Sequence, residues 1–187
     1  MDSKYCYPNS DVLINKLDIR DLNKLHEAER KLTSLRELEL METPIKGNFD
    51  LRHLQRIHEY IFQDIYEWAG RIRTVDIAKS NMFCKVQFIE SQAEDIFKQL
   101  KKDMYLMGLD KELLIKKLTY YFSEINALHP FREGNGRTQR EFIRELAMHN
   151  GLIVHFSRIT EGEMLEASVD SFLCRYEKME SLFWKSI

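Results

Sequence analysis

The residues best suited to chemistry lie in one uninterrupted run, from His129 to Arg140 (HPFREGNGRTQR). Within one loop and one helical turn, this run combines a potential general base at His129, a carboxylate at Glu133 and a glycine turn. Two arginines, Arg137 and Arg140, complete it. Glycine lets the backbone approach an anion closely, and arginine binds phosphate oxygens well. The combination predicts an active site that handles a polyphosphate.

Two helices must position this run. Apolar side chains recur at helical spacing over residues 110–128, which predicts the first helix. Pro130 disfavours the α conformation for the residue before it, so this helix should end at His129. His129 is therefore expected at a corner between a helix and a loop.

The second helix is expected over residues 138–149, with Asn135 as its N-cap. Gly134 and Gly136 permit backbone conformations that other residues avoid. A helix N-terminus offers unpaired N–H groups and the positive end of a dipole, both of which attract anions. Phosphate is the expected ligand at this end.

The charges of the run support the same interpretation. Arg137 and Arg140 are three residues apart, so they share one helix face, yet arginines at a helix N-terminus oppose the dipole. A bound anion would remove that conflict. Glu133, just before the glycine turn, would be repelled by a polyphosphate unless a hard cation bridged them. Glu133 is therefore the expected ligand of a magnesium ion.

The run resembles the motif of the Fic (filamentation induced by cAMP) family, His-x-Phe-x-Asp/Glu-Gly-Asn-Gly-Arg-x-x-Arg, at every defining position. Residues 62–73 are similar to the family segment that precedes its β-hairpin flap, and the resemblance continues through residues 156–172. Most of the chain is thus covered. The implied fold is all-α, a helical bundle with a short β-hairpin flap beside the active site.

The resemblance implies transfer of AMP from ATP to a hydroxyl side chain of a target protein. His129 would deprotonate the attacking hydroxyl, and Glu133 would hold Mg²⁺ against the phosphates. Catalysis would then consist mostly of positioning and electrostatics. The residues implied to bind the ATP phosphates are Gly134, Asn135, Gly136, Arg137 and Arg140.

One segment, residues 72–86, breaks the helical pattern. Its β-branched residues on either side of a turn near residues 79–81 predict a hairpin. The resemblance implies that this hairpin is the flap, which would hold the target by strand addition. The alternative is a hairpin that only joins two helices. The implied docking residues are Lys79, Ser80, Asn81, Met82 and Phe83.

Helical periodicity dominates elsewhere, and Thr160 with Glu163 predicts a capping box. Phe131 is expected to anchor the motif loop in the core. The other expected helices span residues 21–41, 50–66, 89–105 and 175–185. The first of these should bury an apolar side made of Leu22, Leu25, Ala28, Leu32, Leu35 and Leu38 or Leu40.

Length and composition fit a single domain over residues 1–187. It would comprise an N-terminal helical part (about 1–48) and a core (about 49–187) that includes the flap. Lys and Arg total 28 against 30 Asp and Glu, a net charge of −2, so no basic footprint for nucleic acid appears. No apolar stretch approaches the roughly 20 residues that span a bilayer, and we expect a cytoplasmic protein. Three dispersed cysteines are expected as reduced thiols: Cys6, Cys84 and Cys174.

Regulation is the last question the sequence raises. Many Fic proteins are restrained by a helix carrying Ser/Thr-x-x-x-Glu-Gly/Asn, whose Glu would here pair with Arg140. Residues 157–162 match literally but are explained by the Thr160 cap, and in the match at residues 33–38 Leu38 replaces the final Gly or Asn. The chain therefore resembles toxins inhibited in trans by a small antitoxin that carries the inhibitory helix.

Three functions follow from different classes. The first is a toxin that transfers AMP to a bacterial target, for which the family suggests type II topoisomerase subunits. The second is an effector acting on host proteins. The chain length offers no separate secretion domain, which weighs against this function. The third is a homologue that binds nucleotide without transfer, against which the intact His129 and both arginines argue.

Overall fold

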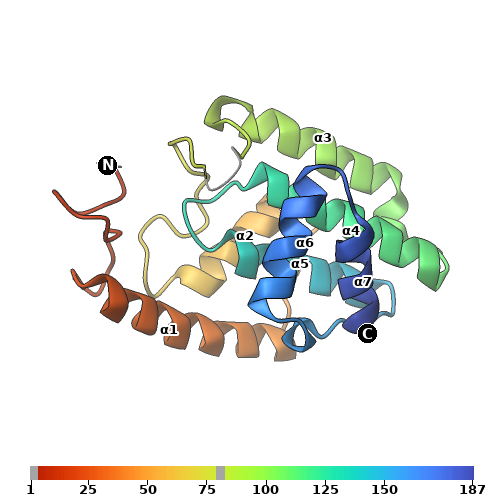
Figure 1. Ribbon diagram of the computed structural model, residues 1–187, viewed down its shortest axis with the longest axis horizontal. Helices are drawn as coiled ribbons and strands as arrows, with labels where there is room; N and C mark the ends of the chain where they lie inside the picture. The colour runs from red at the N-terminus through yellow and green to blue at the C-terminus, as the bar shows by residue number, and fades with distance from the viewer. Residues whose placement is uncertain (1–3, 79–82) are drawn as a thin grey trace.

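A computed structural model describes residues 4–78 and 83–187, which together form an all-α fold (Figure 1). In this part of the chain no helix is both long and apolar enough to span a membrane. The three cysteines are free thiols, as expected. The α-helices are α1 (Leu22–Glu42), α2 (Leu51–Phe62), α3 (Ile89–Lys102), α4 (Lys111–Leu128), α5 (Asn135–His149), α6 (Glu161–Phe172) and α7 (Glu177–Lys185). Short 3₁₀ helices are η1 (Val86–Phe88), η2 (Met104–Leu106) and η3 (Phe156–Arg158).

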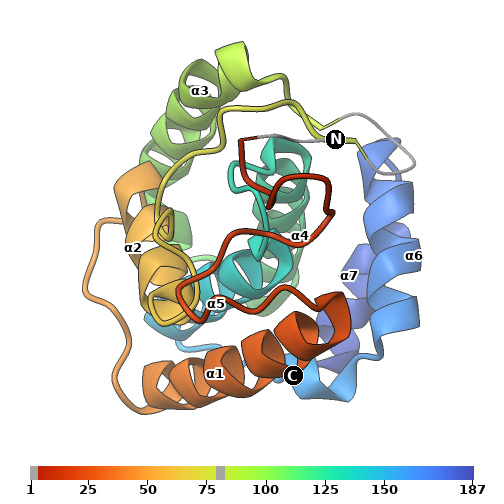
Figure 2. The same cartoon turned by 90° about the vertical axis from the view of Figure 1, so that its left-hand side faces the viewer.

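Helices α4 and α5 pack against each other in the middle of the molecule (Figure 2). The surrounding helices cover this pair: α2 packs on α5, α3 on α4, and α7 on α4, while α6 packs on α7. Helix α1 packs on α2 and runs along one side of the bundle. The central pair is fully buried at its contact, as at Leu118 and Phe122 of α4 and Phe142 and Leu146 of α5. The two central helices are therefore the ones that carry the ends of the motif run.

Local signals fix most helix ends as the sequence predicted. The Asp110 carboxylate accepts a hydrogen bond from the N–H of Leu113 (2.9 Å) and caps α4. Helix α4 ends at Leu128, since His129 is left-handed with φ 47°. Thr160 and Glu163 form the expected capping box at the start of α6.

Three helices are shorter than expected. Helix α2 ends at Phe62 rather than residue 66, because the N–H groups of Ile65 and Tyr66 both turn back to the Phe62 carbonyl. Helix α3 ends at Lys102, after which Tyr105 is left-handed (φ 52°) and interrupts the helix. Helix α7 begins at residue 177 rather than 175.

The apolar side predicted for α1 is confirmed only in part, and Leu32 also packs against the core. Leu25 and Leu40 are buried, but Leu22, Leu35 and Leu38 are exposed by 43%, 55% and 59%. The inner face of α1 carries instead the polar residues Glu29 (7% exposed) and Thr33 (1%). Helical periodicity predicted the helix correctly. The face that packs inward includes polar residues because it contacts an arginine of α5.

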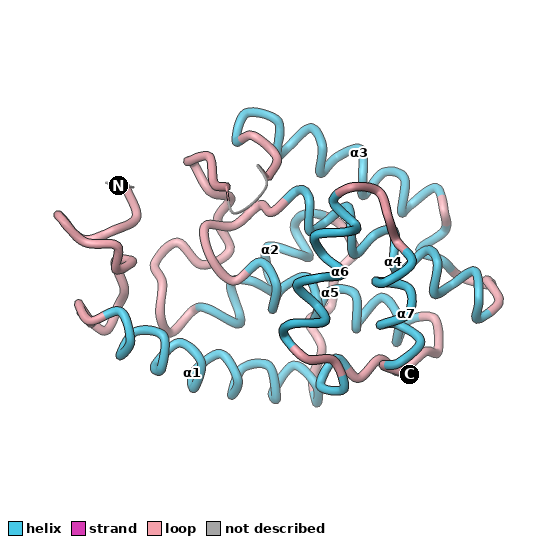
Figure 3. Tube along the Cα trace, viewed as in Figure 1, coloured by secondary structure: helices cyan, strands magenta, loops and turns pink. Residues whose placement is uncertain are grey.

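The predicted hairpin of residues 72–86 forms no strand in its described parts, 72–78 and 83–86 (Figure 3). The buried Arg73 guanidinium replaces a backbone ladder by donating to the carbonyl oxygens of Val75 (2.8 Å) and Cys84. Backbone hydrogen bonds of the two arms go to the motif corner: Arg73 N–H to Pro130 (2.9 Å) and Cys84 N–H to Ala127 (3.1 Å). The two described arms are thus joined to each other by Arg73 and are both fastened to the active-site corner.

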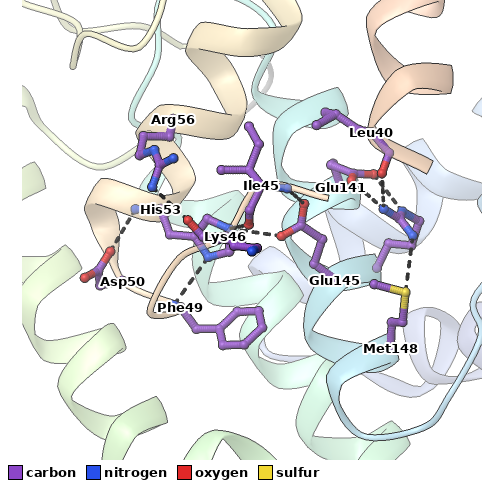
Figure 4. A network of polar contacts seen from close by, with 11 residues as sticks. Leu40, Ile45, Lys46, Phe49, Asp50, His53, Arg56, Glu141, Glu145 and Met148 are labelled. Atoms are coloured by element: carbon purple, nitrogen blue, oxygen red, sulfur yellow. Dashed lines mark hydrogen bonds and ion pairs between the residues drawn. The ribbon is translucent and has the colours of Figure 1, made fainter. Parts of the chain in front are cut away.

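A buried polar network fastens the linker between α1 and α2 to the far end of α5 (Figure 4). The Glu145 carboxylate accepts the N–H of Ile45 (3.2 Å) and lies 3.0 Å from His53 Nε2. The neighbouring Arg144 donates to the Leu40 carbonyl (3.0 Å) and pairs with Glu141 (2.7 Å). Helix α5 is therefore tied to α1 at both of its ends.

Candidate active site

A groove of about 1000 Å³ runs along α5 between α1 and α6. All the motif residues predicted to act on phosphates line it except Asn135: His129, Glu133, Gly134, Gly136, Arg137 and Arg140. Its outer walls are apolar and include Leu38 and Met41 from α1, and Leu165, Val169 and Phe172 from α6. The structure thus gathers the predicted residues at one polar floor between two apolar walls.

His129 stands at the corner where α4 ends. Its Nδ1 lies 3.3 Å from the Asn126 carbonyl oxygen, one turn back in α4. A carbonyl can only accept, so this contact favours the tautomer with the proton on Nδ1 and the lone pair on Nε2. The backbone carbonyl of His129 accepts from Arg73 Nε (2.9 Å). Both contacts hold the imidazole in one orientation, as a general base requires.

Phe83 covers the His129 imidazole. The two rings are stacked with centroids 3.7 Å apart and an interplanar angle of 11°. Phe83 also meets Phe172 of α6 edge-on, at 6.0 Å. The other residues predicted to dock a target, Lys79, Ser80, Asn81 and Met82, lie outside the described part of the chain.

The motif loop differs from expectation at its cap. Gly134, not Asn135, is the N-cap of α5, and it is left-handed with φ 81°. Asn135 is already helical and buried, and its side chain both accepts from the Phe131 N–H (2.9 Å) and donates to the Phe131 carbonyl (2.8 Å). Phe131 is 1% exposed and is the core anchor that the sequence predicted. The Asn135 side chain therefore shapes the loop from below and does not face the groove.

Two glycines leave room for an anion in different ways. A Cβ at Gly134 would fall 2.1 Å from the Phe62 ring, so only glycine fits there. A Cβ at Gly136 would fall 3.3 Å from Nη1 of Arg140, which shows that the Arg140 guanidinium folds back over the first turn of α5. The two glycines thus add no side chain of their own at the start of α5, where Arg140 lies.

His58 supports the loop, a role the sequence did not reveal. Its Nδ1 accepts from the Gly70 N–H (2.8 Å), so Nε2 carries the proton and donates to the Glu133 carbonyl (3.0 Å). Burial lowers the pKa of His58 to about 3, so the ring is neutral at pH 7. It also stacks on Phe131 with centroids 3.9 Å apart. No spacing signal identifies this residue, because its partners lie 12 and 75 positions away.

Arg137 is bound by α1. Its Nη2 lies 2.5 Å from a Glu29 carboxylate oxygen, and its Nη1 donates to Thr33 Oγ1 (3.0 Å). The guanidinium lies over the Phe62 ring, 4.7 Å from its centroid. Nη2 also lies 3.9 Å from the Glu133 carboxylate. The first motif arginine thus bridges α1 and the metal-ligand candidate.

Arg140 lies deeper in the groove, and burial lowers its pKa, although an arginine remains charged at pH 7. The carboxylate of Glu37, on α1, counteracts that shift. Burial in turn raises the pKa of Glu37, while the charges of Arg140 and Arg137 oppose the rise. Glu37 therefore faces the two arginines across the groove floor.

Glu133 fits the role of a magnesium ligand. Its carboxylate borders the groove, is 43% exposed, and accepts from the Gly134 N–H (2.9 Å). Among the described residues, no cluster of three or more His, Cys, Asp and Glu side chains could enclose an ion. Mg²⁺ is commonly held by one or two carboxylates together with substrate phosphates, and one accessible carboxylate beside a phosphate site meets that pattern.

Comparison with known proteins decides the family. The family model described as "Fic/DOC family" matches residues 48–147, which contain the whole motif run. The chain belongs to the Fic/DOC family. Among curated Fic proteins, it is 42% identical over 184 residues to "Protein adenylyltransferase VbhT" of Bartonella schoenbuchensis, covering 98% of this chain and 38% of that protein. It is 34% identical to "Probable protein adenylyltransferase Fic" of Escherichia coli, covering 98% of this chain and 91% of that protein.

Solved structures agree with this fold. The crystal structure of the BepC protein of Bartonella tribocorum, a VirB-translocated effector with bound AMPPNP, superposes with a TM-score of 0.91 at 28% identity. The alignment covers 96% of this chain and 93% of that one. The N-terminal Fic domain of a Bartonella quintana effector, with bound ADP, gives a TM-score of 0.92 at 29% identity. The all-α Fic fold predicted from the sequence is confirmed.

Proposed function

We propose that this protein is an adenylyltransferase that moves AMP from ATP to a hydroxyl side chain of a target protein. The observation that carries the proposal is the shared groove in which the His129 base faces the α5 N-terminus and its two arginines. The names of relatives at 34–42% identity as adenylyltransferases support it. So do adenine nucleotides bound to the structural neighbours.

The chemistry follows from the groove. His129 Nε2 takes the proton of the target hydroxyl, whose oxygen then attacks the α-phosphorus of ATP. The bond from that phosphorus to the bridging oxygen breaks, and pyrophosphate leaves. Arg140 and the backbone N–H groups at Gly136 and Arg137 stabilise the charge that develops on the leaving phosphates. Glu133 would hold Mg²⁺, which supplies further neutralisation of the phosphate charge when bound.

The decisive experiment is incubation of the purified chain with α-labelled ATP, magnesium and bacterial lysate, followed by mass spectrometry of labelled bands. We expect labelled proteins with the native chain and none with His129→Ala. His26→Ala is a matched control, since this exposed histidine of α1 does not line the groove. Nucleotide binding without label transfer by the native chain would instead identify a binding-only homologue.

For the biological role we propose the toxin of a toxin–antitoxin pair, cytoplasmic, with type II topoisomerase subunits as candidate targets. The apolar walls at Leu38, Met41, Leu165 and Val169 suit the apolar face of an antitoxin helix, whose carboxylate could reach Arg140. A different role, as an effector acting on host proteins, is favoured by the effector descriptions of the structural neighbours. Labelled bacterial topoisomerase subunits support the toxin, and labelled host proteins with no bacterial target support the effector.

Glu37 decides whether inhibition comes from within the chain or from a partner. Because Glu37 already faces Arg140, a large gain in label transfer by Glu37→Gly would mean that this carboxylate inhibits in cis. We expect no strong gain, since the antitoxin proposal assigns inhibition to a separate helix. Glu27→Gly, an exposed position in the interior of the same helix, controls for loss of helix propensity.

A further inference from the structure

A carboxylate outside the motif occupies the motif arginine. Glu29 is 7% exposed, lies on α1 outside residues 48–147, and is separated from Arg137 by 108 positions. Its Oε1 is 2.5 Å from Arg137 Nη2, and its Oε2 accepts a short hydrogen bond from the Tyr66 hydroxyl. Burial first, and then the Glu29 carboxylate, raise the pKa of Tyr66, so the phenol stays protonated and keeps donating. Both oxygens of Glu29 are thus used.

Thr33 completes the arrangement one turn further along α1. Its hydroxyl accepts from Arg137 Nη1 (3.0 Å) and donates to the backbone carbonyl of Glu29 (2.8 Å). The face of the guanidinium lies on the Phe62 ring. Arg137 is therefore held at two nitrogens and one face by groups that belong to α1 and α2.

The pair has an electrostatic consequence for the phosphate site. A buried ion pair that loses one partner leaves the other charge uncompensated, which is strongly unfavourable. If Glu29 lost its charge, an arriving polyphosphate would supply the negative charge that Arg137 then lacks. Glu29 and the ligand phosphates therefore compete for the charge of Arg137, while Glu29 and Thr33 together fix its direction.

We propose that Glu29 is a positioning residue and resident counter-ion of Arg137, which limits how tightly the site binds polyphosphate and holds Arg137 in its working orientation. The positioning part of this inference rests on the proposed function, because it concerns the orientation of Arg137 during AMP transfer. Its binding part concerns inorganic polyphosphate alone. It assigns to α1 a direct part in the active site.

The test compares Glu29→Gln with the native chain in titration calorimetry against inorganic tripolyphosphate, and in AMP-transfer kinetics. Glutamine keeps the shape and one acceptor but removes the charge. We expect Glu29→Gln to bind tripolyphosphate roughly tenfold more tightly, about 1.4 kcal/mol, and to transfer AMP with a lower kcat. A purely structural role would instead leave affinity unchanged or weaken it, and that result would overturn the proposal. Glu27→Gln, an exposed carboxylate on the same helix, should match the native chain in both assays.

Thr33→Val provides an independent test if Glu29→Gln does not fold. Valine has nearly the same shape but cannot accept a hydrogen bond from Arg137, so the charge pair survives and the second anchor is lost. We expect affinity for tripolyphosphate within about twofold and a reduced kcat; an unchanged kcat would overturn the positioning role. The two proposals can fail separately. If the native chain transfers no AMP but Glu29→Gln still binds tripolyphosphate more tightly than the native chain does, this inference stands while the proposed function fails.

Discussion

At the scale of single residues, the motif is completed by side chains that lie far from it in sequence. His58 donates to the Glu133 carbonyl and accepts from Gly70, so it ties the metal-ligand candidate to the segment after α2. Its imidazole must be neutral to do both, and burial with a pKa of about 3 keeps it so. The loop that carries the predicted phosphate ligands therefore depends on one uncharged histidine.

The protonation of His58 predicts an acid-sensitive fold. The unfolded ring has a pKa of about 6.5 and the folded ring about 3, so the unfolded state binds the extra proton between these values. This contribution to stability is complete above pH 6.5 and is lost as the pH falls towards 3, at about 1.4 kcal/mol per pH unit. Urea unfolding at pH 7, 6 and 5 measures that slope.

The matched variant for this prediction is His58→Gln, which can still donate and accept but does not titrate. The expected result is a shallower loss of unfolding free energy between pH 7 and 5 than in the native chain, whatever the variant's absolute stability. His155→Gln removes an exposed histidine and should keep the native slope. Parallel slopes for His58→Gln and the native chain would mean that His58 is not buried in its neutral form.

At the scale of elements, the start of α5 has two glycines, one at the N-cap and one in the first turn, that differ in whether a Cβ atom would fit. Gly134→Ala puts a Cβ 2.1 Å from the Phe62 ring at φ 81°, so we expect a loss of roughly 2–4 kcal/mol of unfolding free energy. Gly136→Ala meets only the movable end of Arg140 within a helix, where alanine is favoured by up to about 1 kcal/mol. Urea titrations of the two variants give both values directly.

Activity should not follow stability at these two positions. Gly136→Ala is expected to be as stable as the native chain or slightly more, yet to transfer AMP slowly, because the methyl group displaces Arg140 and narrows the phosphate approach. A Gly136→Ala protein with full transfer activity would argue against a phosphate at the α5 N-terminus. The comparison thus separates the glycine that the fold requires from the glycine that the ligand requires.

Local signals explain what the sequence predicted well at this scale. The end of α4 before Pro130, the Thr160 capping box and the Phe131 anchor all depend on residues within a few positions of one another. One contact that is equally local was not predicted. Gly134 rather than Asn135 caps α5, because the Asn135 side chain is committed to both backbone groups of Phe131, which only the folded loop reveals.

Longer-range contacts explain the errors. Periodicity predicted that α1 would bury leucines, but its inner face meets Arg137, whose position 104–108 residues away no pattern discloses. The described arms of the predicted hairpin are joined by the Arg73 guanidinium, while its predicted turn, residues 79–81, lies outside the described part of the chain. In both cases the contacts of an arginine outweigh the apolar or β-branched pattern around it.

At the scale of the whole molecule, α5 connects the groove to the opposite side of the bundle. Its C-terminal half holds the linker between α1 and α2 through Glu145, which pairs with His53 and accepts from Ile45 (Figure 4). We expect Glu145→Gln to cost about 1–3 kcal/mol of unfolding free energy, since a buried carboxylate loses charged hydrogen bonds. Chemical denaturation measures the loss.

The same variant tests whether this network is separate from the chemistry. Because Glu145 does not line the groove, tripolyphosphate affinity of the folded Glu145→Gln protein should stay within about twofold of the native value. Glu177→Gln, an exposed carboxylate at the start of α7, is the control for stability. A large change in affinity would mean that the linker, and α1 with it, shifts when this contact is lost.

The dependence of Arg137 on Glu29 also affects which fragments of this protein can keep an intact active site. The recognised family region starts at residue 48, so a fragment cut at that boundary keeps every motif residue but discards the carboxylate that neutralises one of them. Such a fragment would carry an exposed cationic cleft prone to capturing adventitious anions. A fragment of this chain that is meant to keep the active site therefore needs α1 as well as the motif.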